Sequence, residues 1–233
     1  MKKIGFIIFI VAIIIGVTFA NFFSWGKASA RIFNFSVNFG GVKGSGNVVN
    51  EKRNLANFNA IEVGGIFEVE VVAQKEFSVE VEADDNLLQY IKTEVNGDTL
   101  EIRTEKSISP KSSIRIRISA PNIENLQVSG VSKVSVVNLK NETLKVDASG
   151  ASKIKVDGET KNLEVELSGA SKLDAENLKS ENADIDGSGA SNAAVNVSGD
   201  LKADLSGASK VTYTGNPKNL EKSTSGASSV KGK

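Results

Sequence analysis

The sequence of 233 residues contains no cysteine and no histidine. Without cysteine it has no disulfide, no thiolate nucleophile and no thiolate zinc site. Without histidine it has no imidazole general base, no Ser–His pair and no imidazole metal ligand. We therefore expect no catalytic, cofactor-binding or metal site, and a fold stabilised by core burial and backbone pairing.

The sequence also has no surplus of either charge. Lysine and arginine number 28, aspartate and glutamate number 28, and no arginine follows Arg117. Proteins that bind nucleic acids through phosphate need a basic surplus. Nucleic acid is therefore not expected as a partner.

Two lysines precede an apolar run at 4–20 that continues, with few polar residues, to Trp25. This length meets the roughly 20 apolar residues that a membrane span needs, and Trp25 would lie at the interface. A secretory signal peptide with a cleavage site at 28–30 is the alternative. Residues 1–25 are thus expected to be a transmembrane anchor or a signal peptide, with membrane contact through residues 4–25 and the remainder exported.

Residues 26–42 are expected to form a linker or a first strand, because apolar and polar residues alternate at 33–39. From Ile61 onward this period of two dominates and predicts short strands. Asn96-Gly97-Asp98 is typical of a hairpin turn. One short helical turn is expected between Asp84 and Ile91, with Asp84 as its cap.

After Pro121 the tetrapeptide Ser-Gly-Ala-Ser, once Ser-Gly-Val-Ser, recurs six times. It begins at Ser129, Ser149, Ser168, Ser188, Ser206 and Ser225, with successive spacings of 20, 19, 20, 18 and 19 residues. A fixed period near 20 residues is typical of a solenoid.

Short alternating strands flank each tetrapeptide, so one unit exposes an apolar face that only stacking can bury. Pairing at a constant offset makes the sheets parallel, and parallel crossovers favour a right-handed coil. The expected fold is therefore all-β, a parallel β-solenoid of ~19-residue rungs. We expect it to span 43–233, with an irregular part at 43–121 and regular rungs at 122–233.

The tetrapeptides are expected to form the corners between strands. Glycine allows a sharp bend, alanine would fit a tight interior, and the serine hydroxyls would satisfy corner amides. The corner glycines are Gly130, Gly150, Gly169, Gly189, Gly207 and Gly226.

Charged residues recur on both sides of the corners. Two positions before the tetrapeptide stand Asp147, Glu166, Asp186 and Asp204, and directly after it stand Lys133, Lys153, Lys172 and Lys210. Stacking would turn these into an acidic and a basic column. Like charges in register repel, so each column needs solvent, partners or ions. A solvated face and a stripe that binds calcium or a glycan are both consistent with this pattern, although no Gly-Gly-x-Gly-x-Asp calcium loop is present.

With the repeats in view, the chain from about Lys43 to Lys233 resembles the bacterial putative auto-transporter adhesin, head GIN domain family. The resemblance is carried by "GSGNVVNEKR" at 44–53, "IEVGGIFEVEV" at 61–71, "VEADDNLLQYIKTEVNGDTLEI" at 81–102, "IRIRISAPNIENLQVSG" at 114–130 and the "SGAS" corners. Relatives often carry Gly-Ser-Gly-Asp at the corners, so the lysine-bearing corners here are a variant. The resemblance implies a β-helical domain in a bacterial envelope, behind an N-terminal signal or anchor, and defines no catalytic residues.

These observations lead to three hypotheses of function. The first is a non-catalytic, membrane-anchored module, periplasmic or on the cell surface, that binds a glycan or an envelope protein in an adhesin-like manner. The second is a self-assembling structural scaffold of the envelope, associating through the open C-terminal edge, where an unpaired strand invites pairing. The third is a β-helix enzyme acting on polysaccharides, although the regular rungs leave no room for the long loops that surround such active sites.

Overall fold

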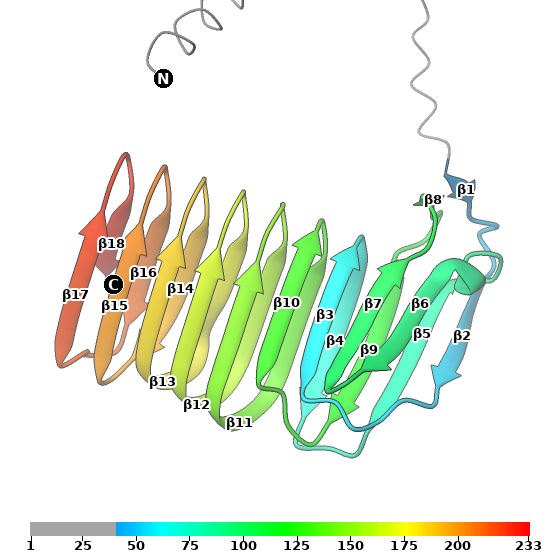
Figure 1. Cartoon of the computed structure of the whole chain (residues 1–233), viewed down its shortest axis with the longest axis horizontal. Coiled ribbons are helices and arrows are strands. Elements are labelled where there is room, and N and C mark those ends of the chain that lie inside the picture. The colour runs from blue at the N-terminus through cyan, green and yellow to red at the C-terminus, as the bar shows by residue number, and fades with distance from the viewer. Residues whose placement is uncertain (1–40) are drawn as a thin grey trace, which may run out of the picture. The chain divides into compact units, whose positions relative to one another are not determined.

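The computed structural model describes residues 41–233 (Figure 1). The expected anchor at 1–25 and the alternating segment at 33–39 lie outside the described residues. Residues 40–233 form one unit. Within residues 41–233, no helix is long and apolar enough to cross a membrane.

The described chain is all-β, with a single 3-10 turn, η1, at Leu88–Tyr90. Its N-terminal strands are β1 (Val42–Lys43), β2 (Val48–Arg53), β3 (Ala60–Gly65), β4 (Phe67–Ala73), β5 (Ser78–Asp84), β6 (Ile91–Asn96), β7 (Thr99–Thr104), β8 (Ile108–Ser109) and β9 (Ile114–Ala120). The repeats form β10 (Asn125–Gly130), β11 (Lys133–Ala148), β12 (Lys153–Leu167), β13 (Lys172–Gly187), β14 (Asn192–Val197), β15 (Asp200–Leu205), β16 (Lys210–Thr214), β17 (Asn219–Thr224) and β18 (Ser229–Gly232).

The strands form a large, mostly parallel sheet folded into two layers, as in a solenoid. In Figure 1 the strands before each corner lie in front and those after it lie behind. The long strands β11, β12 and β13 bend and run through both layers, so one 16-stranded sheet includes both layers, and β1 and β8 pair in a separate two-stranded sheet. Each pairs in parallel with the next rung, for example Leu144 with Leu163 and Leu163 with Ala183. The expected stacking of repeats is the observed one.

The irregular N-terminal part does not stack in chain order. β10 pairs with β3, and β3 pairs on its other side with β7. In the second layer β4 lies between β11 and β9. Antiparallel strands complete this end, with β6 beside β7 in one layer, and β5 beside β9 and β2 beside β5 in the other. The antiparallel strands cover the parallel ladder at its N-terminal end.

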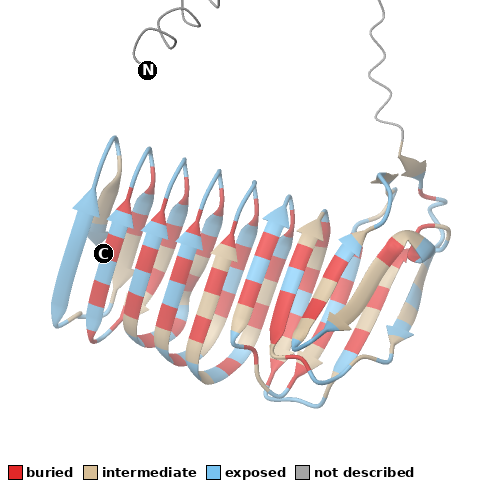
Figure 2. Cartoon of the chain, viewed as in Figure 1, coloured by how far each residue is buried: buried red, intermediate tan, exposed pale blue. Residues whose placement is uncertain are grey.

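The core is a continuous column of mostly aliphatic side chains between the layers, and Figure 2 shows buried positions alternating with exposed ones along the strands. The core follows the pleat, because alternate residues of each strand point inward. One inward position reads Leu126, Val146, Val165, Ile185 and Ala203 through successive rungs, all buried. In the β17–β18 rung the same position is Lys222, and all of β17 is exposed. The apolar ladder therefore ends at this rung.

Each corner glycine has a left-handed backbone, for example φ +67° at Gly169. A Cβ added to Gly169 would stand 2.6 Å from the carbonyl oxygen of Gly150 in the preceding rung. The amide of Ala170 donates to that oxygen at 2.8 Å. Backbone pairing thus continues from rung to rung through the corner, and only glycine leaves room for it.

The expected role of alanine at the corners was wrong, and the expected role of serine holds at one corner, where the Ser132 hydroxyl accepts the Phe67 amide at 3.2 Å. The corner alanines, such as Ala170, are exposed, whereas the last serine of each regular corner before the final rung is buried. The Ser171 hydroxyl donates to the carbonyl of Ser168 at 2.7 Å, and Ser209 donates to Ser206 at 2.9 Å. The hydroxyl faces inward because it satisfies a carbonyl that an alanine methyl would leave without a partner.

Two local expectations near the N-terminal end had different outcomes. The hairpin at Asn96-Gly97-Asp98 is confirmed, because β6 and β7 pair antiparallel from Asn96 with Thr99 onward. Asp84 does not cap η1, whose N-cap is Leu87. The Asp84 carboxylate is fully buried and accepts the amides of Gly46 at 3.0 Å and Lys111 at 2.8 Å. It joins segments distant in sequence, which single-sequence cap rules cannot foresee.

Candidate functional site

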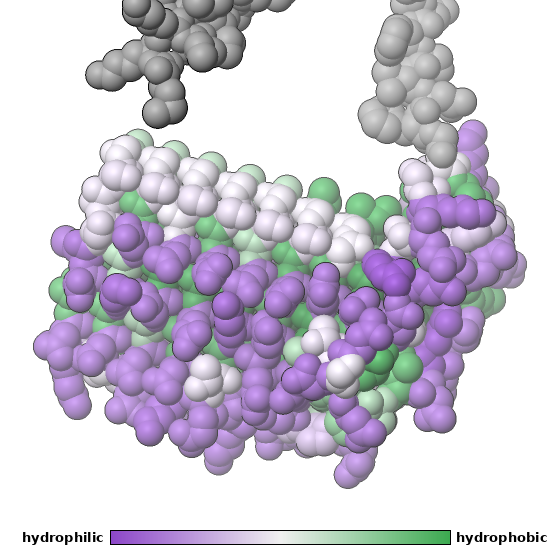
Figure 3. All heavy atoms as spheres, viewed as in Figure 1, coloured by the Kyte–Doolittle hydropathy of each residue, from purple (hydrophilic) through white to green (hydrophobic). Residues whose placement is uncertain are grey.

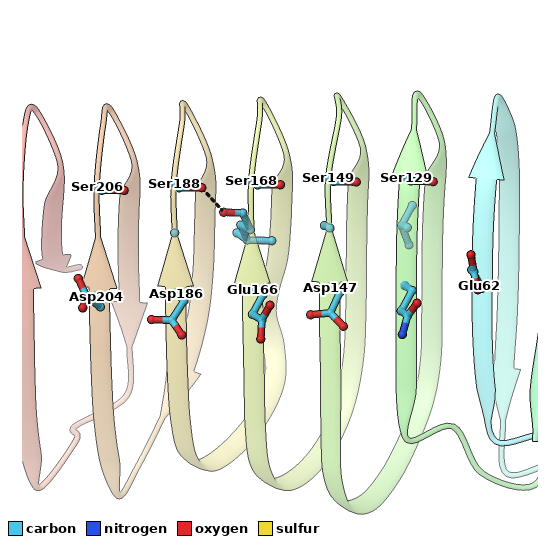
Figure 4. A pocket seen from close by; sticks show the side chains of 15 residues that line it. Glu62, Ser129, Asp147, Ser149, Glu166, Ser168, Asp186, Ser188, Asp204 and Ser206 are labelled. Carbon is cyan, nitrogen blue, oxygen red and sulfur yellow. Dashed lines mark hydrogen bonds between the residues drawn. The ribbon is translucent and has the colours of Figure 1, made fainter. Parts of the chain in front are cut away.

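A groove of about 680 Å³ runs along the front layer just below the corners (Figure 4). One wall carries a row of carboxylates, interrupted once by Gln127, and the other carries the first serine of five corners. The carboxylates are Glu62, Asp147, Glu166, Asp186 and Asp204, and the serines are Ser129, Ser149, Ser168, Ser188 and Ser206. Figure 3 shows this layer as a hydrophilic face below a pale row of small corner residues.

The carboxylates are in strict register because their strands are. Asp147 pairs with Glu166, Glu166 with Asp186, and Asp186 with Asp204. Their side chains point outward because both sequence neighbours of each point into the core. Neighbouring carboxylates therefore recur at the ~4.8 Å strand spacing. The arrangement is a linear array of hydrogen-bond acceptors beside a linear array of hydroxyls.

The electrostatics of the groove change along its length. Lys145 Nζ lies 3.8 Å from Asp147 Oδ2 and 3.6 Å from Glu166 Oε1. Burial raises the pKa of the Asp147 carboxyl above its usual value, the Lys145 charge opposes this, and the Glu166 charge adds to it. Asp186 and Asp204 form no ion pair with any residue of the described chain. The C-terminal half of the groove is thus the part whose charge is least compensated.

The lysines that follow the corners lie on the opposite layer. Lys133, Lys153 and Lys172 are neighbours in register, but Asn192 separates Lys172 from Lys210. Lys133 Nζ pairs with Glu68 Oε1 at 3.1 Å. The other three lysines have no acidic partner within residues 41–233. The two columns that the sequence places beside each corner therefore face away from one another and form no common site.

Sequence reasoning missed part of the groove. The column continues toward the N-terminal end, in register with Asp147, through the neutral Gln127 to the carboxylate of Glu62. Glu62 stands two positions before Gly64-Gly65, as Asp147 stands two positions before its corner. That spacing could have identified Glu62 as part of the column, but it was missed because Gly-Gly-Ile-Phe does not match the Ser-Gly-Ala-Ser tetrapeptide.

In the described part of the chain, no group of three or more acidic residues has the geometry to hold a metal ion. The carboxylates follow one line along the sheet and do not converge on a point, whereas calcium requires six to eight oxygens around it. The arrangement suits contact with an elongated partner better than enclosure of an ion.

Fold and site together define a β-solenoid repeat protein that displays the same side chains rung after rung along an open groove. The chain belongs to the family described as "putative auto-transporter adhesin, head GIN domain", whose model matches residues 57–217. This family description indicates an adhesin-like role, with binding to some partner, at an extracellular or envelope location. No curated protein matches the chain.

Several solved structures share the fold. A "putative adhesin" from Bacteroides fragilis is 19% identical, with a TM-score of 0.70 over 83% of this chain and 100% of that one. A "putative adhesin" from Parabacteroides merdae is 18% identical, with a TM-score of 0.55 over 82% and 98%. A "putative lipid binding protein" from Parabacteroides distasonis is 17% identical, with a TM-score of 0.52 over 82% and 99%. At these identities the likeness concerns the fold alone.

Proposed function

We propose that the chain is a non-catalytic, adhesin-like binding module of the bacterial cell envelope, and that the acidic groove is its binding face. The observation that carries this proposal is the groove itself. Carboxylates and hydroxyls line it in register on four consecutive rungs from Asp147 to Asp204, so a linear ligand meets the same chemistry at each of these rungs. The proposed ligand is a glycan of the envelope, with an envelope protein as the other candidate.

A non-catalytic role is supported by the way the carboxylates are distributed. Glycoside-cleaving enzymes place two carboxyl groups on either side of one bond. Here acidic side chains recur with the fold on four consecutive rungs, from Asp147 to Asp204, and stand in one line. The sequence also contains no histidine or cysteine that could serve as a nucleophile or base.

The proposal includes attachment to the membrane by residues 1–25, uncleaved, with the solenoid on the extracytoplasmic side. Its support is the apolar run at 4–20, whose continuation to Trp25 exceeds the roughly 7–15 residues of a signal core. The proposal also includes a right-handed coil, supported by the direction in which successive rungs advance in Figure 1. A scaffold that assembles through the β17–β18 edge receives less support, because stacking there would bury Lys222.

The test is retention of purified residues 41–233 on isolated peptidoglycan and envelope polysaccharides, with calcium and with chelator. The variant Asp147→Asn/Glu166→Gln/Asp186→Asn neutralises the groove. The matched control Lys133→Gln/Lys153→Gln/Lys172→Gln removes the same number of charges from the other layer. Retention that the groove variant loses and the lysine control keeps supports the proposal. Retention that survives in the groove variant, or no retention on any of these polymers, contradicts it.

A further inference from the structure

The zero net charge of the chain conceals a strong separation of charge between the two layers. The two outward columns before the corners carry Asp147, Glu164, Glu166, Asp184, Asp186, Asp204 and Glu221 against Lys145 and Lys202. The two outward columns after the corners, from Lys133 on, carry Lys133, Lys153, Lys155, Lys172, Lys210 and Lys231 against Asp174. We call these the acidic face and the basic face.

The two faces belong to opposite layers of one solenoid, because the corner turns the chain from the front layer to the back layer (Figure 1). Each face is built on the same rungs, so the charges of both repeat at the same ~4.8 Å interval. A second copy placed beside the first by translation alone would bring its basic face onto the acidic face of the first. Lysines and carboxylates would then meet at matching spacing over several rungs.

The charges without intramolecular partners are the ones that such a contact would use. Lys153 and Lys172 stand on adjacent rungs, and so do Asp186 and Asp204. None of these four forms an ion pair with a described residue. The carboxylates line the groove, into which a flexible lysine side chain can reach with its ammonium group.

We infer that the basic face binds the acidic face of a second copy of this chain, side by side. The interface is heterologous, since different surfaces of the two copies meet, and a translational contact of this kind does not close. It leads to lateral rows of parallel solenoids. This inference does not depend on the proposed ligand, because it requires only the charges of the chain itself.

The test is sedimentation velocity of residues 41–233, whose core is formed by residues 58–211. It compares about 20 mM salt, where charges act over about 20 Å, with about 300 mM, where they act over about 6 Å. The expected result is concentration-dependent association at low salt, weakened on the order of tenfold or more at high salt.

Two charge reversals make the test specific. Lys153→Glu/Lys172→Glu reverses the two adjacent unpaired lysines of the basic face, and Asp186→Lys/Asp204→Lys reverses the two adjacent unpaired carboxylates of the acidic face. Each variant alone is expected to remain monomeric, and an equimolar mixture is expected to associate again. Lys140→Glu/Lys161→Glu makes the same change in net charge away from the basic face, and this control should associate like the unmodified chain.

Each other outcome overturns the inference. An unmodified chain that stays monomeric at low salt shows that the faces do not bind. Association that persists in both reversed variants places the contact elsewhere on the molecule. An equal loss in the Lys140/Lys161 control shows that net charge, and not the basic face, decides association. Failure of polymer retention in the earlier experiment leaves all these readings unchanged, because no ligand is present here.

Discussion

Replacing Gly169 with alanine measures how much the corner contacts between rungs contribute to stability. Its φ of +67° costs an alanine about 1–2 kcal/mol. The new Cβ would stand 2.6 Å from the Gly150 carbonyl oxygen, a backbone atom that can yield only if the rung shifts. Overpacking of this kind costs about 1–3 kcal/mol. The alanine regains about 0.4–1 kcal/mol by restricting the unfolded chain.

Together these terms predict that Gly169→Ala lowers the free energy of unfolding by about 2–4 kcal/mol. The chain supplies a matched control in Gly97, whose φ is +64° and whose Cβ would meet nothing within 4 Å. Gly97→Ala therefore tests the backbone conformation without the clash, and about 1 kcal/mol is expected.

The assay is urea unfolding of both variants and the unmodified fragment 41–233, followed by circular dichroism. The difference between the two variants isolates the contact with the preceding rung. Equal losses from Gly169→Ala and Gly97→Ala would refute the reasoning, because they would show that the stacked carbonyl imposes no constraint beyond φ.

Three further predictions concern single side chains. Lys222→Leu should make the fragment dimerise in about 300 mM salt, where contacts between the acidic and basic faces are screened, and Lys222→Gln should not. Sedimentation of the two variants shows whether Lys222 prevents association through the β17–β18 rung. Hydrogen bonds from Arg115 and then Arg117 lower the pKa of Glu82, so its ionised form stabilises the fold above the unfolded pKa of about 4.3. Glu82→Gln should lower the free energy of unfolding by about 1 kcal/mol at pH 7, and this loss should disappear as the pH falls through the lowered pKa. A loss that stays constant from pH 7 to pH 3 would contradict this prediction. Burial raises the pKa of Asp147, so the protonated carboxyl stabilises the fold, and this stabilisation is lost as the pH rises through the raised pKa. Asp147→Asn should therefore unfold at a higher urea concentration than the unmodified fragment at pH 7, but not at pH 3. A variant that is less stable than the unmodified fragment at pH 7 would refute this direction of the effect.

The regular rungs could be predicted from sequence because each is specified locally. A glycine at a fixed offset from two alternating apolar sets determines the corner, the pleat and the partner one period away. The outward position of Asp147 and Glu166 followed from the same alternation. The corner chemistry could not be predicted as easily, because Ala170 and Ser171 are both small and only the inward carbonyl of Ser168 decides which of them is buried.

The N-terminal part resisted prediction for a different reason. The insertion of β3 between β7 and β10 pairs strands far apart in sequence. No local sequence pattern specifies which of the other strands a given strand will pair with. The buried Asp84 likewise unites amides from two distant segments. The end of the apolar ladder at Lys222, by contrast, was visible as a charged residue at an inward position of the repeat.

The register of the groove has a consequence for how a polymer would move on it. Because four carboxylates, from Asp147 to Asp204, repeat at one interval, a chain of matching period finds several positions of nearly equal energy, displaced from one another by whole rungs. Four equivalent positions would contribute about 0.8 kcal/mol of favourable entropy to binding. They would also allow the bound chain to step along the solenoid without releasing all of its contacts. The groove thus offers binding positions separated by one rung, and each added rung would add one such position.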